Sequence, residues 1–300
     1  MRSQSNQEQA SGVFYAIGAY LCWGLFPLYW KPLESIEPLQ IICHRVLWSA
    51  LFLLLVLSVR RHWSWLAAFR AAPGKLGIFC LSSTMLTANW LMYIWAVNAG
   101  HIVESSLGYF INPLVNVLLG RLFLGEQLGK MQKVAVLLAA CGVMWMTLQL
   151  GAFPWISLGL ALSFGVYGLL RKQAPLPSLE GLTLETLLMA PLALIVLAVF
   201  EFRGTGCFGH IGWKLDTMLM GAGVITTVPL LLFAHGARRL KLATIGLIQY
   251  ISPTLQLLLG VLLYHEAFDS ARAVGFALIW AGLLVYTAGS VRSLLRARLA

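Results

Sequence analysis

The sequence predicts an all-α integral membrane protein whose ten transmembrane helices form two inverted five-helix repeats. Three observations lead to this prediction: an apolar composition, ten apolar stretches of spanning length, and a similarity between the two halves of the chain. Of the 300 residues, 59% are hydrophobic and only 11% are charged, and the mean hydropathy is +0.81. Soluble domains carry about 25% charged residues, so this chain has too few to solvate a surface.

Ten stretches are long and apolar enough to form transmembrane helices, since a bilayer core requires about 20 apolar residues per helix. Two stretches, 76–100 and 242–264, contain no Asp, Glu, Lys or Arg. The first stretch lacks a small-residue cleavage site, so we expect a retained helix rather than a signal peptide. The predicted helices are 12–30, 38–58, 76–98, 104–124, 133–150, 154–171, 182–200, 217–236, 243–264 and 271–290.

Lys and Arg are distributed unevenly over the predicted loops. Segments on the side of the two termini carry sixteen of them, whereas the opposite loops carry only Lys31, Arg203, Lys214 and Arg272. Cytoplasmic loops of membrane proteins are enriched in these residues, so both termini are predicted to be cytoplasmic. The net charge of +10 is scattered through short loops, which argues against nucleic acid as a partner.

The second half of the chain repeats the first at an offset of 140 residues. Residues 107–126 read LGYFINPLVNVLLGRLFLGE and residues 247–266 read LIQYISPTLQLLLGVLLYHE, with eight of twenty positions identical. The identical positions include Pro113 with Pro253 and Glu126 with Glu266. A repeat of five helices crosses an odd number of times, so the second copy must enter the membrane from the opposite side. We therefore predict two domains, 12–150 and 154–291.

Several segments resemble the EamA family of the drug/metabolite transporter superfamily, and more narrowly its chloramphenicol-sensitivity protein (RarD) subfamily. They are WGLFPLYWKPL, HRVLWS, NWLMYIWAVN, SLGYFINPL, YGLLRK, LTLETLL and IGLIQYISPTLQLLLG, and the resemblance extends over about 12–291. It implies a permease of the bacterial cytoplasmic membrane with two EamA domains. Amino acids, other metabolites and amphipathic drugs all remain open as substrates.

Polar side chains inside spans face the protein interior or a wet cavity, because hydrocarbon cannot solvate them. Tyr109, Asn112 and Asn116 share one helical face, and the second repeat carries a corresponding stripe. The stripes either line one cavity or form hydrogen bonds that join helices. Pro113 and Pro253 each remove a backbone hydrogen bond, as hinges or as compensated kinks. The second stripe comprises Gln249, Ser252 and Gln256, and Tyr250 is a further candidate residue beside it.

Charged or titratable side chains also lie within predicted spans. His44 and Arg45 lie about 10 Å inside the periplasmic end of the second helix, and Glu185 is the counterpart of Arg45 in the second repeat. Because inversion places them at opposite depths, a direct ion pair between Arg45 and Glu185 is not assumed. Each is a candidate for a gate on its own side of the membrane, with snorkelling to the interface as the alternative for both. Glu185 and His44 are the titratable candidates for proton coupling.

Asn89, Trp90 and Tyr93 form a polar and aromatic face that suits an aromatic or amphipathic solute, with interhelical packing as the alternative. No nucleotide-binding loop or cysteine–histidine cluster is present, so we expect no cofactor and no metal. The expected partners are a small-molecule substrate, membrane lipids, protons and a second copy of the chain.

The predicted function is a secondary transporter that moves a small solute by alternating access. A membrane-embedded enzyme would need paired catalytic residues, but Asp216 and Asp269 lie at loop edges and His265-Glu266 lacks a second metal-binding histidine. A channel would need charged rings or a filter-like loop. Enzyme and channel remain the alternatives.

Overall fold

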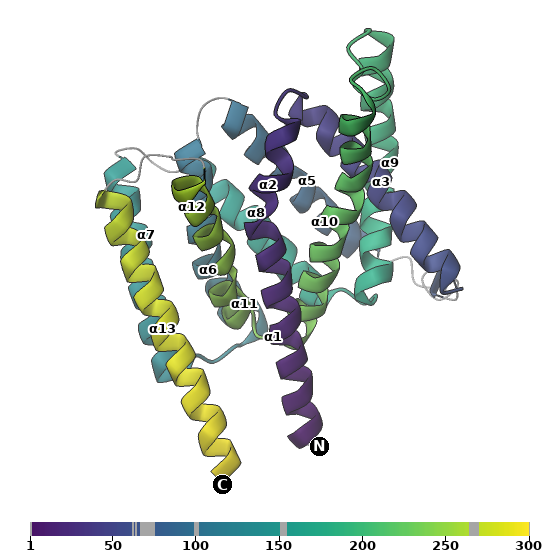
Figure 1. The fold of residues 1–300 in the computed structure, drawn as a ribbon. Helices are drawn as coiled ribbons and strands as arrows, with labels where there is room; N and C mark the ends of the chain where they lie inside the picture. Colours follow the sequence, from purple (N-terminus) through teal and green to yellow (C-terminus); the bar gives the residue numbers. More distant parts are fainter. Residues whose placement is uncertain are drawn as a thin grey trace. The chain divides into compact units, whose positions relative to one another are not determined.

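The computed structural model describes residues 2–61, 63, 65–66, 76–98, 102–150, 155–263 and 270–299, and their regular structure is helical (Figure 1). The chain divides into two compact units. Unit 1 comprises Met1–Ala88 and Leu170–Arg239, and unit 2 comprises Asn89–Leu169 and Leu240–Ala300. Each unit therefore combines segments of both sequence repeats. Glu266 and the predicted domain boundary near residue 152 lie outside the described residues.

Prolines define several helix ends in unit 1. The first predicted helix starts earlier than expected and is interrupted at Leu25, just before Pro27, so 12–30 as one helix is wrong. Pro38 occupies the first turn of α3, where its missing N–H costs nothing. The helices of unit 1 are α1 Arg2–Gly24, α2 Phe26–Trp30, η1 Lys31–Leu33, α3 Pro38–Val59, α9 Ser178–Phe202, α10 Trp213–Arg239 and parts of α5 Leu76–Asn98 and α8 Trp155–Gln173.

In unit 2, the two matched prolines have different consequences. Pro113 lies inside one continuous helix, whereas the predicted helix 243–264 is interrupted at Tyr250, three residues before Pro253. Pro253 cannot donate a hydrogen bond to the carbonyl of Gln249, which accounts for a break at this point. Besides the remaining parts of α5 and α8, unit 2 contains α6 Ile102–Leu124, α7 Lys130–Leu150, α11 Leu242–Gln249, α12 Ile251–Leu262 and α13 Ser270–Leu299.

Six apolar segments in the described part of the chain are long enough to cross a membrane. They are α3, α9 and α10 in unit 1, and 107–124, 130–149 and 242–259 in unit 2. The pair Gln7–Gly24 and Phe26–Leu33, bent by 41°, makes a seventh if it forms one span. Large apolar side chains such as Leu55 and Leu284 are exposed on these units, as lipid contact requires. The protein is thus an all-α membrane protein.

Helices α7 and α13 lie side by side, and glycines on both helices allow a close approach (Figure 1). A Cβ atom added to Gly142 would lie 2.7 Å from the carbonyl oxygen of Gly275, and one added to Gly282 would lie 2.7 Å from that of Ala135. These two contacts exchange under the 140-residue offset, since 142 corresponds to 282 and 275 corresponds to 135. The contact between α7 and α13 is therefore symmetric between the two repeats, and glycine is required at positions 142 and 282.

Gly142→Ala and Gly282→Ala are expected to destabilise the protein by similar amounts, each about 2 kcal/mol, because both overpack a helix crossing. The melting temperature in one detergent measures this effect. Gly77→Ala is the control, since a Cβ atom there would meet nothing within 4 Å. A well-tolerated Gly282→Ala beside a damaging Gly142→Ala would contradict the symmetric crossing.

Candidate functional site

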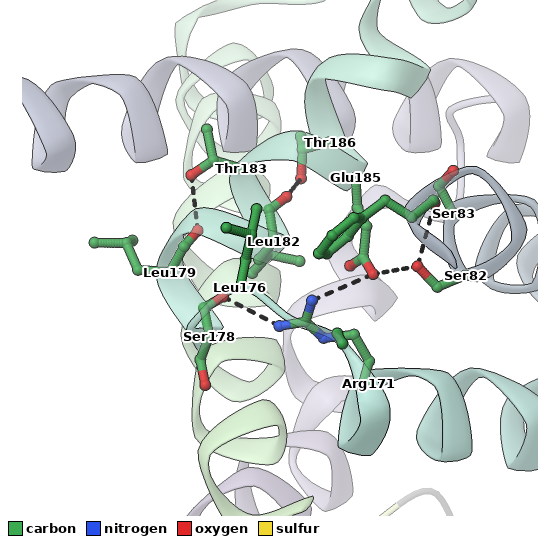
Figure 2. A network of polar contacts seen from close by, with 12 residues as sticks. Ser82, Ser83, Arg171, Leu176, Ser178, Leu179, Leu182, Thr183, Glu185 and Thr186 are labelled. Atoms are coloured by element: carbon green, nitrogen blue, oxygen red, sulfur yellow. Dashed lines mark hydrogen bonds and ion pairs between the residues drawn. The ribbon is translucent and has the colours of Figure 1, made fainter. Parts of the chain in front are cut away.

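A buried ion pair joins Arg171 and Glu185 in unit 1 (Figure 2). The guanidinium Nη1 lies 3.4 Å from the carboxylate Oε1, and the two side chains are 0% and 3% exposed. Nη2 of Arg171 also donates to the backbone carbonyl of Ser178 at 3.2 Å, and the hydroxyl of Ser82 donates to Glu185. Charges removed from water need such compensation, so the three side chains form one coupled polar cluster.

The connection between α8 and α9 places Arg171 next to Glu185. Pro175 and Pro177 separate the two helices, and α9 begins at Ser178 with a glycine in its first turn. A Cβ atom at Gly181 would collide with the guanidinium of Arg171, so this glycine makes room for the ion pair. Arg238 of α10 donates to the carbonyls of Ala174 and Leu176, which holds the connection in place.

A small polar cavity of about 40 Å³ lies in unit 1 beside the ion pair. A cavity needs about 10–15 Å³ on this measure to hold one water molecule, so there is room for about three. Helices α3, α5, α9 and α10 supply the walls. The polar lining residues are Arg45, Ser49, Ser83, Thr87, Glu185, Thr186 and Thr227.

The cavity walls contain residues at equivalent positions of the two repeats. Arg45, Val46 and Ser49 of α3 have Glu185, Thr186 and Met189 of α9 as counterparts at the 140-residue offset, and all six line the cavity. Thr87 of α5 and Thr227 of α10 form a further pair. Arg45 and Glu185 thus line one cavity, and their gating roles stay a prediction.

Neither charged residue of the cavity extends to the surface, since Arg45 is 7% and Glu185 is 2% exposed. His44 is also buried, and its ring lies 5.1 Å from that of Phe208 in the loop between α9 and α10. Gln40 holds this loop: its Nε2 donates to the carbonyl of Thr205, and its Oε1 accepts from the N–H of Cys207, both at 2.9 Å. Burial raises the pKa of the Cys207 thiol.

The predicted polar stripes lie in unit 2, where they form hydrogen bonds both between helices and within one helix. Asn112 donates to the carbonyl of Ala161 at 2.7 Å, and Asn116 donates to Asn112 and to Gln249. The hydroxyl of Tyr250 donates to the carbonyl of Phe110, while Gln256 donates to Ser252 at 3.4 Å. The bonds from Asn112 to Ala161, from Asn116 to Gln249 and from Tyr250 to Phe110 join different helical segments. The other two bonds lie within α6 and within α12.

The polar and aromatic face of α5 behaves similarly within unit 2. Asn89 donates to the carbonyl of Leu160 and to the hydroxyl of Ser163, both at 2.9 Å. The ring of Tyr93 lies 6.3 Å from that of Trp90 and 5.9 Å from that of Tyr109. The structure therefore gathers these predicted residues around helix contacts, whereas Arg45 and Glu185 gather around the cavity of unit 1.

Sequence reasoning missed Arg171, Ser49 and Thr227. Arg171 lies in the last turn of α8 and is one of the sixteen Lys and Arg residues that the sequence analysis counts on the side of the termini. The sequence does contain a signal for this pair. Arg171 lies at the end of one helix and Glu185 lies near the start of the next, so the short Pro-Leu-Pro connection brings the two charges to the same side. The hydroxyl residues carry no such signal.

Comparison with known proteins identifies one family along nearly the whole chain. The chain matches the EamA-like transporter family twice, over residues 10–148 and 153–288. It is 47% identical to "Uncharacterized transporter YojE" of Bacillus subtilis (strain 168) over 290 residues, covering 95% of this chain and 96% of that protein. It is 41% identical to "Protein RarD" of Escherichia coli (strain K12) over 285 residues, covering 95% and 96%.

A solved crystal structure has a similar fold, with a TM-score of 0.70 at 18% sequence identity, covering 94% of this chain and 98% of that chain. The two family matches and the near full-length identity to RarD proteins meet the expectation set by the sequence motifs. The chain therefore belongs to the EamA-like transporter family, within the group of the RarD proteins.

Proposed function

We propose that this protein is a secondary transporter of the bacterial cytoplasmic membrane that carries a small metabolite or an amphipathic drug-like solute by alternating access. It does so with ten transmembrane helices in two inverted repeats, 12–150 and 154–291, and with both termini in the cytoplasm. It carries out no chemical reaction. The observation that carries the proposal is the polar cavity of unit 1, because buried charges inside membrane helices mark solute or ion pathways.

Contacts between counterpart residues support the inverted arrangement. On a two-fold axis a residue meets its own counterpart, and Phe110 and Tyr250, which correspond at the 140-residue offset, lie with ring centroids 6.3 Å apart in unit 2. The exchange of contacts between Gly142 and Gly282 has the same property. In unit 1, residues at equivalent positions of the two repeats line the cavity. Such a lining suits a binding site that opens through one gate to each side of the membrane.

The ion pair supports a gating role on the cytoplasmic side. A second, open polar pocket of about 480 Å³ is lined by Arg60, Ser178, Glu180 and His235, at the ends of α3, α9 and α10 that the proposed topology places in the cytoplasm. Arg171 binds the Ser178 carbonyl at this pocket and Glu185 at the small cavity. Parting of Arg171 from Glu185 would connect the two spaces, and protonation of Glu185 would favour that parting.

Metabolite pools inside and outside cells with and without the protein test the transport proposal. We expect the distribution of at least one solute to change, and the purified protein in liposomes to exchange that solute. In the same liposomes, Glu185→Gln is expected to remove the dependence on a pH gradient while exchange persists, because the carboxylate faces Arg171, Arg45 and Ser82 and is the titratable member of this group.

An unchanged set of metabolite pools together with no exchange in liposomes would contradict transport. Retained gradient dependence in Glu185→Gln would exclude that carboxylate from coupling without affecting the transport proposal. Reporters fused to each end of the chain test the topology, and ends on opposite membrane faces would refute the ten-helix arrangement. A second copy of the chain as partner stays a prediction, which the mass of the protein in nanodiscs would test.

A further inference from the structure

The open pocket of about 480 Å³ in unit 1 lies where the end of α3, the first turn of α9 and the end of α10 meet. Helices α9 and α10 contain 25 and 27 residues, whereas the apolar core of a bilayer requires about 20. Their ends therefore extend to the level of the lipid headgroups. The residues that line the pocket are Arg60, Pro177, Ser178, Leu179, Glu180 and His235.

The start of α9 supplies backbone donors to this pocket. The first N–H groups of a helix have no partner within it, and those of Ser178 and Leu179 donate to no other residue in the described part of the chain. The preceding residue, Pro177, has no side chain that could accept them. The start of α11 in unit 2 is different, because the carboxylate of Glu126 accepts from its first two N–H groups.

The hydroxyl of Ser178 is a second indication of a ligand, independent of the helix end. Ser178 is only 3% exposed and lines the pocket, yet its hydroxyl makes no hydrogen bond with any residue that the structure describes. Figure 2 shows this hydroxyl pointing away from Arg171, which binds the carbonyl of the same residue. Polar groups buried to this extent normally have a hydrogen-bond partner. The hydroxyl is therefore available to a group bound in the pocket.

The charges around the pocket favour an anion. Glu180 supplies a carboxylate to the lining, but it is 4% exposed and interacts electrostatically with Arg238 of α10. Glu185 forms its ion pair with Arg171. Arg60 is exposed and forms neither an ion pair nor a side-chain hydrogen bond with the described residues. Its guanidinium is therefore a surplus positive charge at the pocket.

An exposed apolar stripe on α3 leads to the same place. Leu51, Leu55 and Val59 are 56%, 62% and 75% exposed, and residues four apart share one face of a helix. The stripe ends next to Arg60. An acyl chain on this stripe would bring its headgroup to the pocket, whereas a free phosphate ion gains nothing from it. Basic pockets between transmembrane helices are typical sites for anionic headgroups.

We propose that this pocket binds the headgroup phosphate of an anionic phospholipid. The donors are the Arg60 guanidinium, the Ser178 hydroxyl and the N–H groups at the start of α9. Helix N-termini bind phosphate because their N–H groups and the helix dipole both favour negative charge, and arginine matches the geometry of its oxygens. The inference goes beyond the proposed function, since it requires no step of transport.

Thermal unfolding of the full-length protein in an uncharged detergent, at constant pH and ionic strength, tests the proposal. The probes are phosphatidylglycerol, phosphatidylethanolamine and diacylglycerol with the same acyl chains, together with glycerol phosphate and inorganic phosphate. A ligand that binds only the folded protein raises the melting temperature with its concentration. We expect phosphatidylglycerol to do so in a saturable way, and each of the other probes to give much less protection at the same concentration.

Substitutions locate the site. Arg60→Gln and Ser178→Ala are expected to weaken binding of phosphatidylglycerol about tenfold and about fivefold, respectively, because they remove a charged and a neutral hydrogen-bond donor. Ser178→Ala leaves the net charge unchanged, so it separates the pocket from general attraction to a basic surface. Arg61→Gln is the matched control, because it removes the same charge from the next exposed residue, which does not line the pocket. That variant should bind like the unmodified protein.

Equal protection by phosphatidylethanolamine or diacylglycerol, or equal protection by the soluble phosphates, would overturn the proposal. Unchanged binding in Ser178→Ala would overturn it, and so would a loss in Arg61→Gln as large as that in Arg60→Gln. Absence of protection by phosphatidylglycerol would have the same consequence. The transport proposal is tested separately by the metabolite comparison, and it stands or falls independently of these results.

Discussion

Arg171→Gln is expected to destabilise the protein by about 3 kcal/mol, because it removes the guanidinium that compensates the buried carboxylate of Glu185. The loss should appear as a lower unfolding midpoint in detergent. Arg121→Gln is the matched control, since Arg121 also lies in the last turn of a helix but is exposed. That variant should change stability by less than about 0.5 kcal/mol.

The double variant Arg171→Met/Glu185→Leu separates the stability of the pair from its function. Replacing both charges by apolar groups of similar size removes the desolvation cost on both sides, so most of the lost stability should return. The double variant should nevertheless show no response of transport to a pH gradient, since no titratable group remains at the pair. If Arg171→Gln lowers the free energy of unfolding by no more than about 1 kcal/mol, which is the contribution of an exposed ion pair, then water reaches the charges.

Much of the helical layout could be predicted because its causes are local. Apolar runs and prolines at 38, 175 and 177 delimit α3, α8 and α9 within a few residues of the predicted ends. The interruptions at Leu25 and Tyr250 were missed, although each lies within three residues before a proline. A proline in an apolar run permits either a continuous helix, as at Pro113, or a break, and neighbouring helices decide between them.

The site was harder to predict because its causes are not local. Arg45 and Glu185 were identified as charges inside spans, but their common cavity depends on how α3 and α9 pack. Arg171 resembled an orientation charge, and only the space left by Gly181 allows its burial. The polar stripes were visible in sequence, but periodicity cannot distinguish a cavity wall from a helix contact.

Gly223→Ala is expected to destabilise the protein by about 3 kcal/mol, more than the glycines of the α7–α13 crossing. A Cβ atom at Gly223 would lie 2.6 Å from both the Cβ of Trp48 and the backbone nitrogen of Ser49, so α3 and α10 would have to separate. Gly236→Ala is the control on the same helix. Its nearest neighbours on α1 lie at 3.2 Å, and the gain in helix propensity of about 1 kcal/mol offsets their small adjustment.

Melting curves of Gly223→Ala and Gly236→Ala in one detergent measure the difference. Separation of α3 from α10 would also break the bond from the Ser49 hydroxyl to the Gly223 carbonyl, so the loss in Gly223→Ala combines overpacking with a lost hydrogen bond between the two helices. A Gly223→Ala protein that melts at the same temperature as Gly236→Ala would contradict the close contact between α3 and α10.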